Sequence, residues 1–297
     1  MIASPYSAAL DRIPVREHRA EVLGSDTHWW EYGDPDAAQT IVVVHGFRGD
    51  HHGLEPVVAE LEGYRVVSPD LPGFGASGPL PAHPHDIDGY AAWLTAFVAR
   101  LGLDEPPVVL GHSFGSIVAS AALAAGLGAS RVVLVNPIGA PALEGPRGVM
   151  TRLAVLYYRA GAALPERLGF GLLRNRLIVR VMSVTMAKTR DAGLRRWIHD
   201  QHDRYFSAFG DRDVVLQAFR ASVSHDVREY AGGIAQPVLL IAAERDDITP
   251  IAAQHALRER FADARLEVID GVGHLIHYEA PAAAGAAVRD FLEDGTA

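Results

Sequence analysis

Short apolar runs alternate along this chain with longer stretches of helical periodicity. Six runs are apolar, rich in β-branched residues and bounded by turn-forming residues, as is typical of buried strands. They span residues 41–44, 65–68, 107–110, 131–135, 237–241 and 266–269. The stretch 113–125 is small and apolar all round, which predicts a buried helix, and Asp88 is expected to cap another helix.

This alternation predicts an α/β fold with a mostly parallel, doubly wound sheet that helices cover on both faces. In such sheets ligands bind at the carboxyl ends of the strands. The pattern breaks between residues 137 and 232, where helical periodicity continues without a convincing strand. We therefore expect a core made of residues 1–136 and 233–297, with an inserted helical cap over 137–232.

Charge distinguishes the two parts of the chain. The expected cap holds 15 Lys and Arg against 9 Asp and Glu, a balance of +6, while the whole chain carries −9. The remaining residues therefore carry −15. This acidic balance argues against nucleic acid as a partner. The basic cap favours a small-molecule substrate that is itself anionic.

Composition limits the chemistry and the setting. The chain has 297 residues, of which 49% are hydrophobic, and it has no cysteine. Thiol nucleophiles, disulfides and thiolate metal sites are thereby excluded. We see no signal peptide at the first residues, and the apolar stretch 117–127 is too short to span a bilayer. A cytoplasmic protein with no membrane partner is expected. The oligomeric state cannot be read from the sequence.

Ser113 is the strongest candidate for catalysis. It stands in Gly111-His112-Ser113-Phe114-Gly115, directly after a predicted strand and at the start of a predicted helix. Such a turn is so tight that side chains two residues before and after the serine would collide, which explains both glycines. A chance match is conceivable in a chain with 29 glycines. The strand-to-helix context makes the catalytic interpretation far better supported.

A second turn, His45-Gly46-Phe47, ends the first predicted strand. It is either an ordinary glycine turn or one half of an oxyanion hole. In the second interpretation, the backbone N–H groups of Phe47 and Phe114 meet the negative charge that develops during acyl transfer.

The acid and the base follow the later strands. Asp246 and Asp247 both stand after the strand at 237–241, and either could instead cap the helix that begins near Pro250. His274 follows the last strand between flexible glycines, where it can reach the serine. His112 is a poor base because its side chain points away from that of its neighbour Ser113.

Together these motifs resemble those of the α/β-hydrolases over nearly the whole chain. The order Ser113, Asp246, His274 is similar to that family's order, and Asp70-Leu71-Pro72-Gly73-Phe74-Gly75-Ala76-Ser77 resembles the turn after its fourth strand. Asp246 stands four residues before Pro250, as the family's acid commonly does, which favours it over Asp247. The chain departs from the family at Ala243, where relatives usually have glycine, and in the residues 48–52.

The resemblance implies a serine hydrolase that cleaves a carboxylic ester, lactone or amide without a cofactor. One alternative is a carbon–carbon bond hydrolase of aromatic ring-fission products, for which a basic cap would be suitable. Another is a small-molecule receptor on the same fold. His51-His52 and His83-Pro84-His85 could suggest a metal, but neither pair has an evident third ligand, and we expect no metal site.

Overall fold

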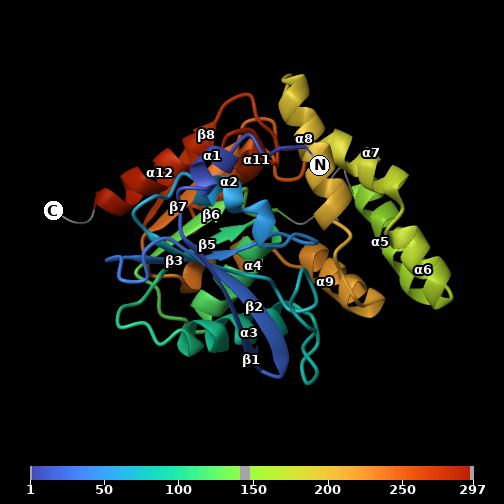
Figure 1. The fold of residues 1–297 in the computed structure, drawn as a ribbon, viewed down its shortest axis with the longest axis horizontal. Helices are drawn as coiled ribbons and strands as arrows, with labels where there is room; N and C mark the ends of the chain where they lie inside the picture. Colours follow the sequence, from blue (N-terminus) through green and yellow to red (C-terminus); the bar gives the residue numbers. More distant parts are fainter. Residues whose placement is uncertain (1, 141–147, 295–297) are drawn as a thin grey trace.

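A computed structural model describes residues 2–140 and 148–294, and its centre is an eight-stranded sheet (Figure 1). The strand order is β1-β2-β4-β3-β5-β6-β7-β8, and every pair from β4 to β8 is parallel. The strands are β1 (Val15–Val22), β2 (Ser25–Tyr32), β3 (Thr40–Val44), β4 (Arg65–Pro69), β5 (Val108–His112), β6 (Arg131–Val135), β7 (Val238–Ala243) and β8 (Ala264–Ile269). The predicted mostly parallel sheet is confirmed.

Helices cover both faces because successive strand residues point to opposite sides. Val42 and Val44 of β3 join one apolar cluster, which includes side chains of α3, α4 and α10. Ile41 and Val43 join a second cluster with α2, α11 and α12. The bounds of these helices are α2 (Glu55–Val58), α3 (Ile87–Arg100), α4 (Phe114–Ala124), α10 (Ile251–Arg258), α11 (Ile276–Glu279) and α12 (Pro281–Glu293). A short helix, α1 (Ser7–Leu10), precedes the sheet.

Two expectations were incomplete. β1 and β2 were not predicted; they form an antiparallel hairpin that joins the sheet through β2 and β4. The cap of α3 is Asp86 rather than Asp88, since the Asp86 side chain accepts a hydrogen bond from the N–H of Gly89. Asp88 instead lies in the first turn, where a carboxylate favours the positive end of the helix dipole.

Five α-helices lie between β6 and β7 in the described part of the chain. They are α5 (Gly148–Ala163), α6 (Glu166–Leu173), α7 (Arg176–Met186), α8 (Ala192–Tyr205) and α9 (Arg212–Ser224). In Figure 1, α5, α6 and α7 form the outer edge of the molecule on the side away from the C-terminus. Residues 141–147 of the expected cap lie outside the described residues, and its separation as a domain stays a prediction. No helix in the described part of the chain is long and apolar enough to cross a membrane.

Candidate active site

Ser113 lies in a sharp turn between β5 and α4, with a backbone φ of 53° and ψ of −117°. The neighbouring backbone explains the two glycines. A Cβ on Gly111 would stand 2.5 Å from the carbonyl oxygen of Gly115, and a Cβ on Gly115 would stand 2.1 Å from that of Val44. Because neither position has room for a side chain, the turn can hold the Ser113 hydroxyl above the carboxyl end of the sheet.

The backbone N–H groups of two residues lie near this hydroxyl. Phe47 follows β3 and Phe114 opens α4, and neither N–H has a hydrogen-bond acceptor within residues 2–140 and 148–294. Gly46 brings the two turns together, because a Cβ there would stand only 3.4 Å from the Cβ of Ser113. Two unsatisfied donors next to a serine hydroxyl form a site that suits a developing oxyanion.

His274 and Asp246 join Ser113 in one chain of hydrogen bonds. The distance from Nε2 of His274 to Oγ of Ser113 is 2.8 Å, and that from Nδ1 to Oδ2 of Asp246 is 2.7 Å. His274 and Asp246 are each about 5% exposed, so this pair is shielded from water. With the proton on Nδ1 and facing the carboxylate, Nε2 is left to accept the serine proton.

The Asp246 carboxylate is held in its ionised form. Burial favours the protonated form, but His274 and the hydrogen bonds from Thr249 outweigh this, and the pKa of Asp246 falls well below its usual range. Oδ1 accepts from the backbone N–H groups of Ile248 and Thr249 at 2.7 and 3.0 Å. Oδ2 accepts from the Thr249 hydroxyl at 2.8 Å and from Asn136 Nδ2 at 3.0 Å. These donors fix the carboxylate against His274.

The competing residues lie elsewhere. Asp247 has a side chain that is 52% exposed and that pairs with Lys188 Nζ at 2.5 Å. His112 is buried beside His274, with ring centroids 5.7 Å apart. Burial and the neighbouring His274 lower the pKa of His112 to about 3, and its Nε2 has no hydrogen-bond partner among the described residues. Neither residue contacts the Ser113 hydroxyl in this arrangement.

Aromatic side chains surround the turn at Phe47. The Phe47 ring lies 5.6 Å from that of Tyr158, 5.7 Å from that of Phe219 and 6.4 Å from that of Phe114. Tyr158 belongs to α5 and Phe219 to α9, so helices from the segment between β6 and β7 contribute to this apolar wall. A site of this kind favours an apolar or aromatic group next to the reacting carbonyl.

Arg48, which sequence reasoning did not assign a role, connects the oxyanion turn to the same helices. It is 1% exposed, and its φ of 58° is unusual for a residue other than glycine. Its guanidinium donates to the carbonyls of Phe206 and Leu173 at 2.8 and 2.9 Å and to the Tyr158 hydroxyl at 3.2 Å. Arg48 therefore anchors α5, α6 and the end of α8 next to Phe47.

Glu279 makes a corresponding connection on the side of the base. Its Oε2 accepts the N–H of Gly273, which precedes His274, at 3.1 Å. Its Oε1 accepts the N–H groups of Lys188 and Thr189, between α7 and α8, at 2.5 and 2.7 Å. Only a three-dimensional arrangement could identify this role, because Lys188 and Thr189 are about 90 positions from Glu279 in the sequence.

No third metal ligand was evident from the sequence beside His51 and His52, but Asp50 is a candidate for one. A possible ligand atom of each of the three residues lies within 4.8 Å of the other two. Protein contacts account for the His51 ring. His51 Nδ1 lies 2.9 Å from Oδ1 of Asp70, and Trp30 stacks on the same ring. We assign His51 a structural role in the turn after Phe47.

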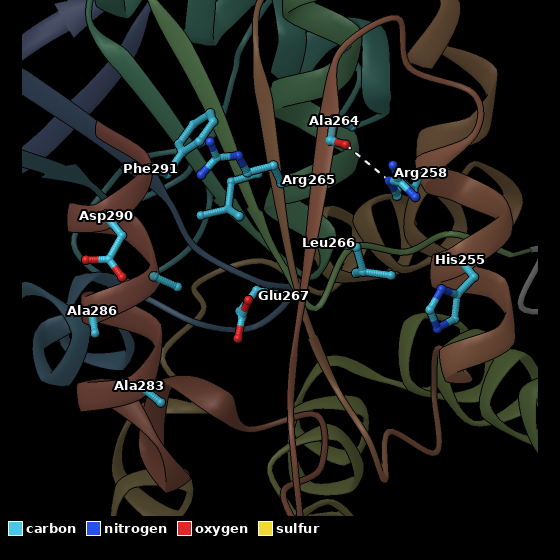
Figure 2. Close-up of a pocket in the computed structure, with 12 residues that line it drawn as sticks. His255, Arg258, Ala264, Arg265, Leu266, Glu267, Ala283, Ala286, Asp290 and Phe291 are labelled. Atoms are coloured by element: carbon cyan, nitrogen blue, oxygen red, sulfur yellow. Dashed lines mark hydrogen bonds between the residues drawn. The ribbon is translucent and has the colours of Figure 1, made fainter. Parts of the chain in front are cut away.

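A groove of about 710 Å³ lies at the β8 edge of the sheet, between α10 and α12 (Figure 2). Its lining includes Leu266 and Glu267 of β8 and Phe291 of α12. Arg258 donates to the carbonyl of Ala264 across it. None of the candidate catalytic residues lines this groove, so we do not assign it to the reaction.

Comparison with known proteins finds a matching family, related sequences and similar folds. The sequence pattern of the "Alpha/beta hydrolase family" matches residues 41–288. The chain is 28% identical to the magnesium-chelatase 30 kDa subunit of Rhodobacter capsulatus over 290 residues, covering 94% of this chain and 96% of that protein. It is 28% identical to the N-formylmaleamate deformylase of Pseudomonas putida, covering 75% and 77%. The fold is similar to an esterase from Exiguobacterium antarcticum, with a TM-score of 0.75, 18% identity and coverage of 93% and 98%.

Proposed function

The chain belongs to the alpha/beta hydrolase family, and we propose that it is a serine hydrolase that cleaves a carboxylic ester, lactone or amide. The observation that carries this proposal is the chain of hydrogen bonds at 2.8 and 2.7 Å from Ser113 through His274 to Asp246. A hydroxyl aligned with an imidazole that a buried carboxylate orients is the arrangement required for acyl transfer.

In the proposed reaction, His274 takes the proton of Ser113 while Oγ attacks the substrate carbonyl. The N–H groups of Phe47 and Phe114 stabilise the resulting oxyanion. The protonated His274 then gives its proton to the leaving alcohol or amine, and an acyl-enzyme remains. His274 then removes a proton from water, which attacks the acyl carbonyl, and returns this proton to Oγ of Ser113 as the acid is released. Asp246 stays ionised throughout and stabilises the imidazolium.

The substrate class rests on the walls of the site. Phe47, Phe114 and Tyr158 favour an apolar acyl or leaving group. N-formylmaleamate deformylase, one of the relatives, is named for acting on an amide-type bond, which supports including amides among the substrates. The anionic substrate suggested by the sequence remains a prediction. Arg48 is the buried cation nearest in sequence to the oxyanion turn, but the protein's own oxygens already take its hydrogen bonds.

The experiment is hydrolysis of p-nitrophenyl acetate and labelling by a fluorophosphonate, with wild type and Ser113→Ala compared. We expect wild type to hydrolyse the ester and to be labelled at Ser113. Ser113→Ala should lose activity by several orders of magnitude while it remains folded. Labelling at another residue, or equal turnover by the two proteins, would refute the assignment. Ring-fission products in the same panel test the carbon–carbon hydrolase alternative.

A second candidate is a small-molecule-binding subunit that binds its ligand near Ser113 without turnover. The observation that favours it is the likeness, along nearly the full length of both chains, to a protein named as a subunit of magnesium chelatase. Binding of a candidate ligand with unchanged affinity in Ser113→Ala, together with no hydrolysis in the wild type, would favour this candidate over the hydrolase.

A further inference from the structure

Exposed apolar side chains gather on the outer helices α5, α6 and α7. Eleven large hydrophobic residues are exposed in the described part of the chain, and seven of them lie between residues 153 and 184. The most exposed are Leu156 at 59%, Leu168 at 61% and Leu177 at 72%. Water-facing aliphatic side chains scattered singly need no explanation, but a concentration on three consecutive helices indicates a surface that another body covers.

On α7 the exposed apolar residues lie on one face of the helix. Leu177, Val181 and Val184 are 72%, 58% and 56% exposed, and their spacing of four and three residues places them on one face of the helix. The opposite face carries Val179 and Ser183, which are 2% and 1% exposed. Ser183 Oγ lies 2.6 Å from Nδ1 of His199 on α8. The inner face is therefore already packed, and the apolar outer face is an additional feature.

The same helices are strongly basic. Residues 148–186 contain six arginines and a single acid, Glu166, a balance of +5 on a chain of −9, which leaves −14 for the rest. Arg159, Arg167 and Arg176 are exposed. Arg180 is engaged with Asp203 of α8. Exposed apolar side chains and exposed arginines thus share one helical segment.

Either a second copy of the chain or a lipid bilayer could cover an apolar surface. The positive charge of this segment favours the bilayer. A second copy that met this face by two-fold symmetry would bring two +5 segments together and be repelled. A bilayer that contains anionic lipid attracts the arginines and accommodates the aliphatic side chains in its interfacial region. Such binding needs no helix that spans the bilayer. It differs from the sequence-based expectation, which considered only spanning segments.

We propose that the outer side of α5–α7 docks on an anionic lipid surface, with Leu156, Leu168 and the Leu177–Val181–Val184 face entering the interface. α5 also carries Tyr158, which packs against Phe47 at the candidate site. One of the docked helices, α5, thus also borders the site. This partner is inferred from exposure and charge alone, and it holds independently of whether the protein is a hydrolase.

The test uses the full-length protein in vesicle flotation. The vesicles contain either phosphatidylcholine alone or equal parts of phosphatidylcholine and phosphatidylglycerol. We expect binding to the anionic vesicles only, with a decline as salt rises. The double variants Leu177→Asn/Val181→Asn and Arg167→Gln/Arg176→Gln should each bind the anionic vesicles at least about tenfold more weakly than wild type. Matched controls are Val15→Asn/Leu23→Asn and Arg12→Gln/Arg100→Gln, which change exposed residues elsewhere and should bind like wild type.

Two further measurements separate membrane docking from catalysis and from misfolding. Ser113→Ala should float with the anionic vesicles as wild type does, so loss of the proposed activity and loss of docking are separable. The α7 variant should keep wild-type hydrolysis of a water-soluble ester, which shows that it is folded. The proposal is overturned if wild type binds neither vesicle, or binds both equally. It is also overturned if wild type is a dimer in light scattering that Leu177→Asn/Val181→Asn converts to a monomer without any vesicle binding.

Discussion

Asn136 Nδ2 donates a hydrogen bond of 3.0 Å to Oδ2 of Asp246, the same oxygen that faces His274. Asn136 follows β6 and Asp246 follows β7, and these strands are parallel neighbours. Asn136 is fully buried, and its backbone has a left-handed φ of 45°. In the proposed mechanism it is a positioning residue that keeps the acid at the right distance from the base.

Replacing Asn136 by aspartate should raise the pH at which activity is lost on acidification. A second carboxylate 3 Å from Asp246 would repel it, so the pKa of one of the pair would rise and that group would be protonated at higher pH. The acid limb of the pH profile of kcat/KM should therefore move upward. Asn136→Gly tolerates the left-handed backbone and removes only the donor. This control should lower kcat/KM without moving the limb, and an identical profile in both variants would contradict the expectation.

Asp246→Asn should lower activity roughly 10³–10⁴-fold, because an amide can no longer hold His274 in the tautomer that accepts the Ser113 proton. The control is Asp247→Asn. Its carboxylate is half-exposed and pairs with Lys188, so activity should stay within a few-fold of wild type. Steady-state hydrolysis of a p-nitrophenyl ester measures both. If the two results were exchanged, the acid would be Asp247.

Acid should destabilise the fold below about pH 6.5 through buried histidines. Burial lowers the pKa of His112 and of His202 to about 3, and it lowers that of His277 well below its usual value. Between the folded and unfolded pKa values the unfolded chain binds more protons, so stability falls as pH falls. Each group contributes up to about 1.4 kcal/mol per pH unit in that window.

Urea unfolding at pH 7.5, 6.5 and 5.5 measures this slope. His277→Leu removes a titrating ring whose Nδ1 has no hydrogen-bond partner among the described residues, and it should make the slope shallower. His83→Asn changes an exposed histidine and should leave the slope as in wild type. A slope that His277→Leu does not alter would place the acid sensitivity in other groups.

Gly115→Ala should destabilise the fold by roughly 3 kcal/mol, since its Cβ would stand 2.1 Å from the Val44 carbonyl and rigid backbone must move. Gly128→Ala is the matched control because no atom lies within 4 Å of the Cβ position there. Urea midpoints with unchanged m-values provide the measurement. Similar midpoints for the two variants would mean that the elbow relaxes at little cost.

The parallel part of the sheet was predictable because buried parallel strands are continuous apolar runs, as in β3 and β6. β1 and β2 were missed because one face of each is solvated and charged residues interrupt the pattern. Their turn, Leu23-Gly24, has positive φ at both residues, the geometry of a type I′ hairpin. Asparagine followed by glycine would have predicted this turn from the sequence, but the first position of the turn is leucine.

The candidate triad was predictable because its three residues follow strands that end at one edge of a sheet. Its supporting contacts were not. Asn136 was not singled out in the sequence, because its hydrogen bond to Asp246 depends on the register of β6 against β7. Arg48 bonds to residues 110 to 158 positions away, and Glu279 bonds to Lys188 and Thr189 about 90 positions away, so no local pattern reports these partners.

Glu279 has a thermodynamic consequence for this arrangement. Because one carboxylate holds both Gly273 beside the base and the Lys188–Thr189 link between α7 and α8, the free energies of ordering these two segments are coupled. Coupling of this kind is reciprocal. A ligand that restrains the Lys188–Thr189 amides must also bias the position of His274. Conversely, a covalent adduct on Ser113 must change the hydrogen-exchange rates of those two amides, and Glu279→Gln should reduce both effects together.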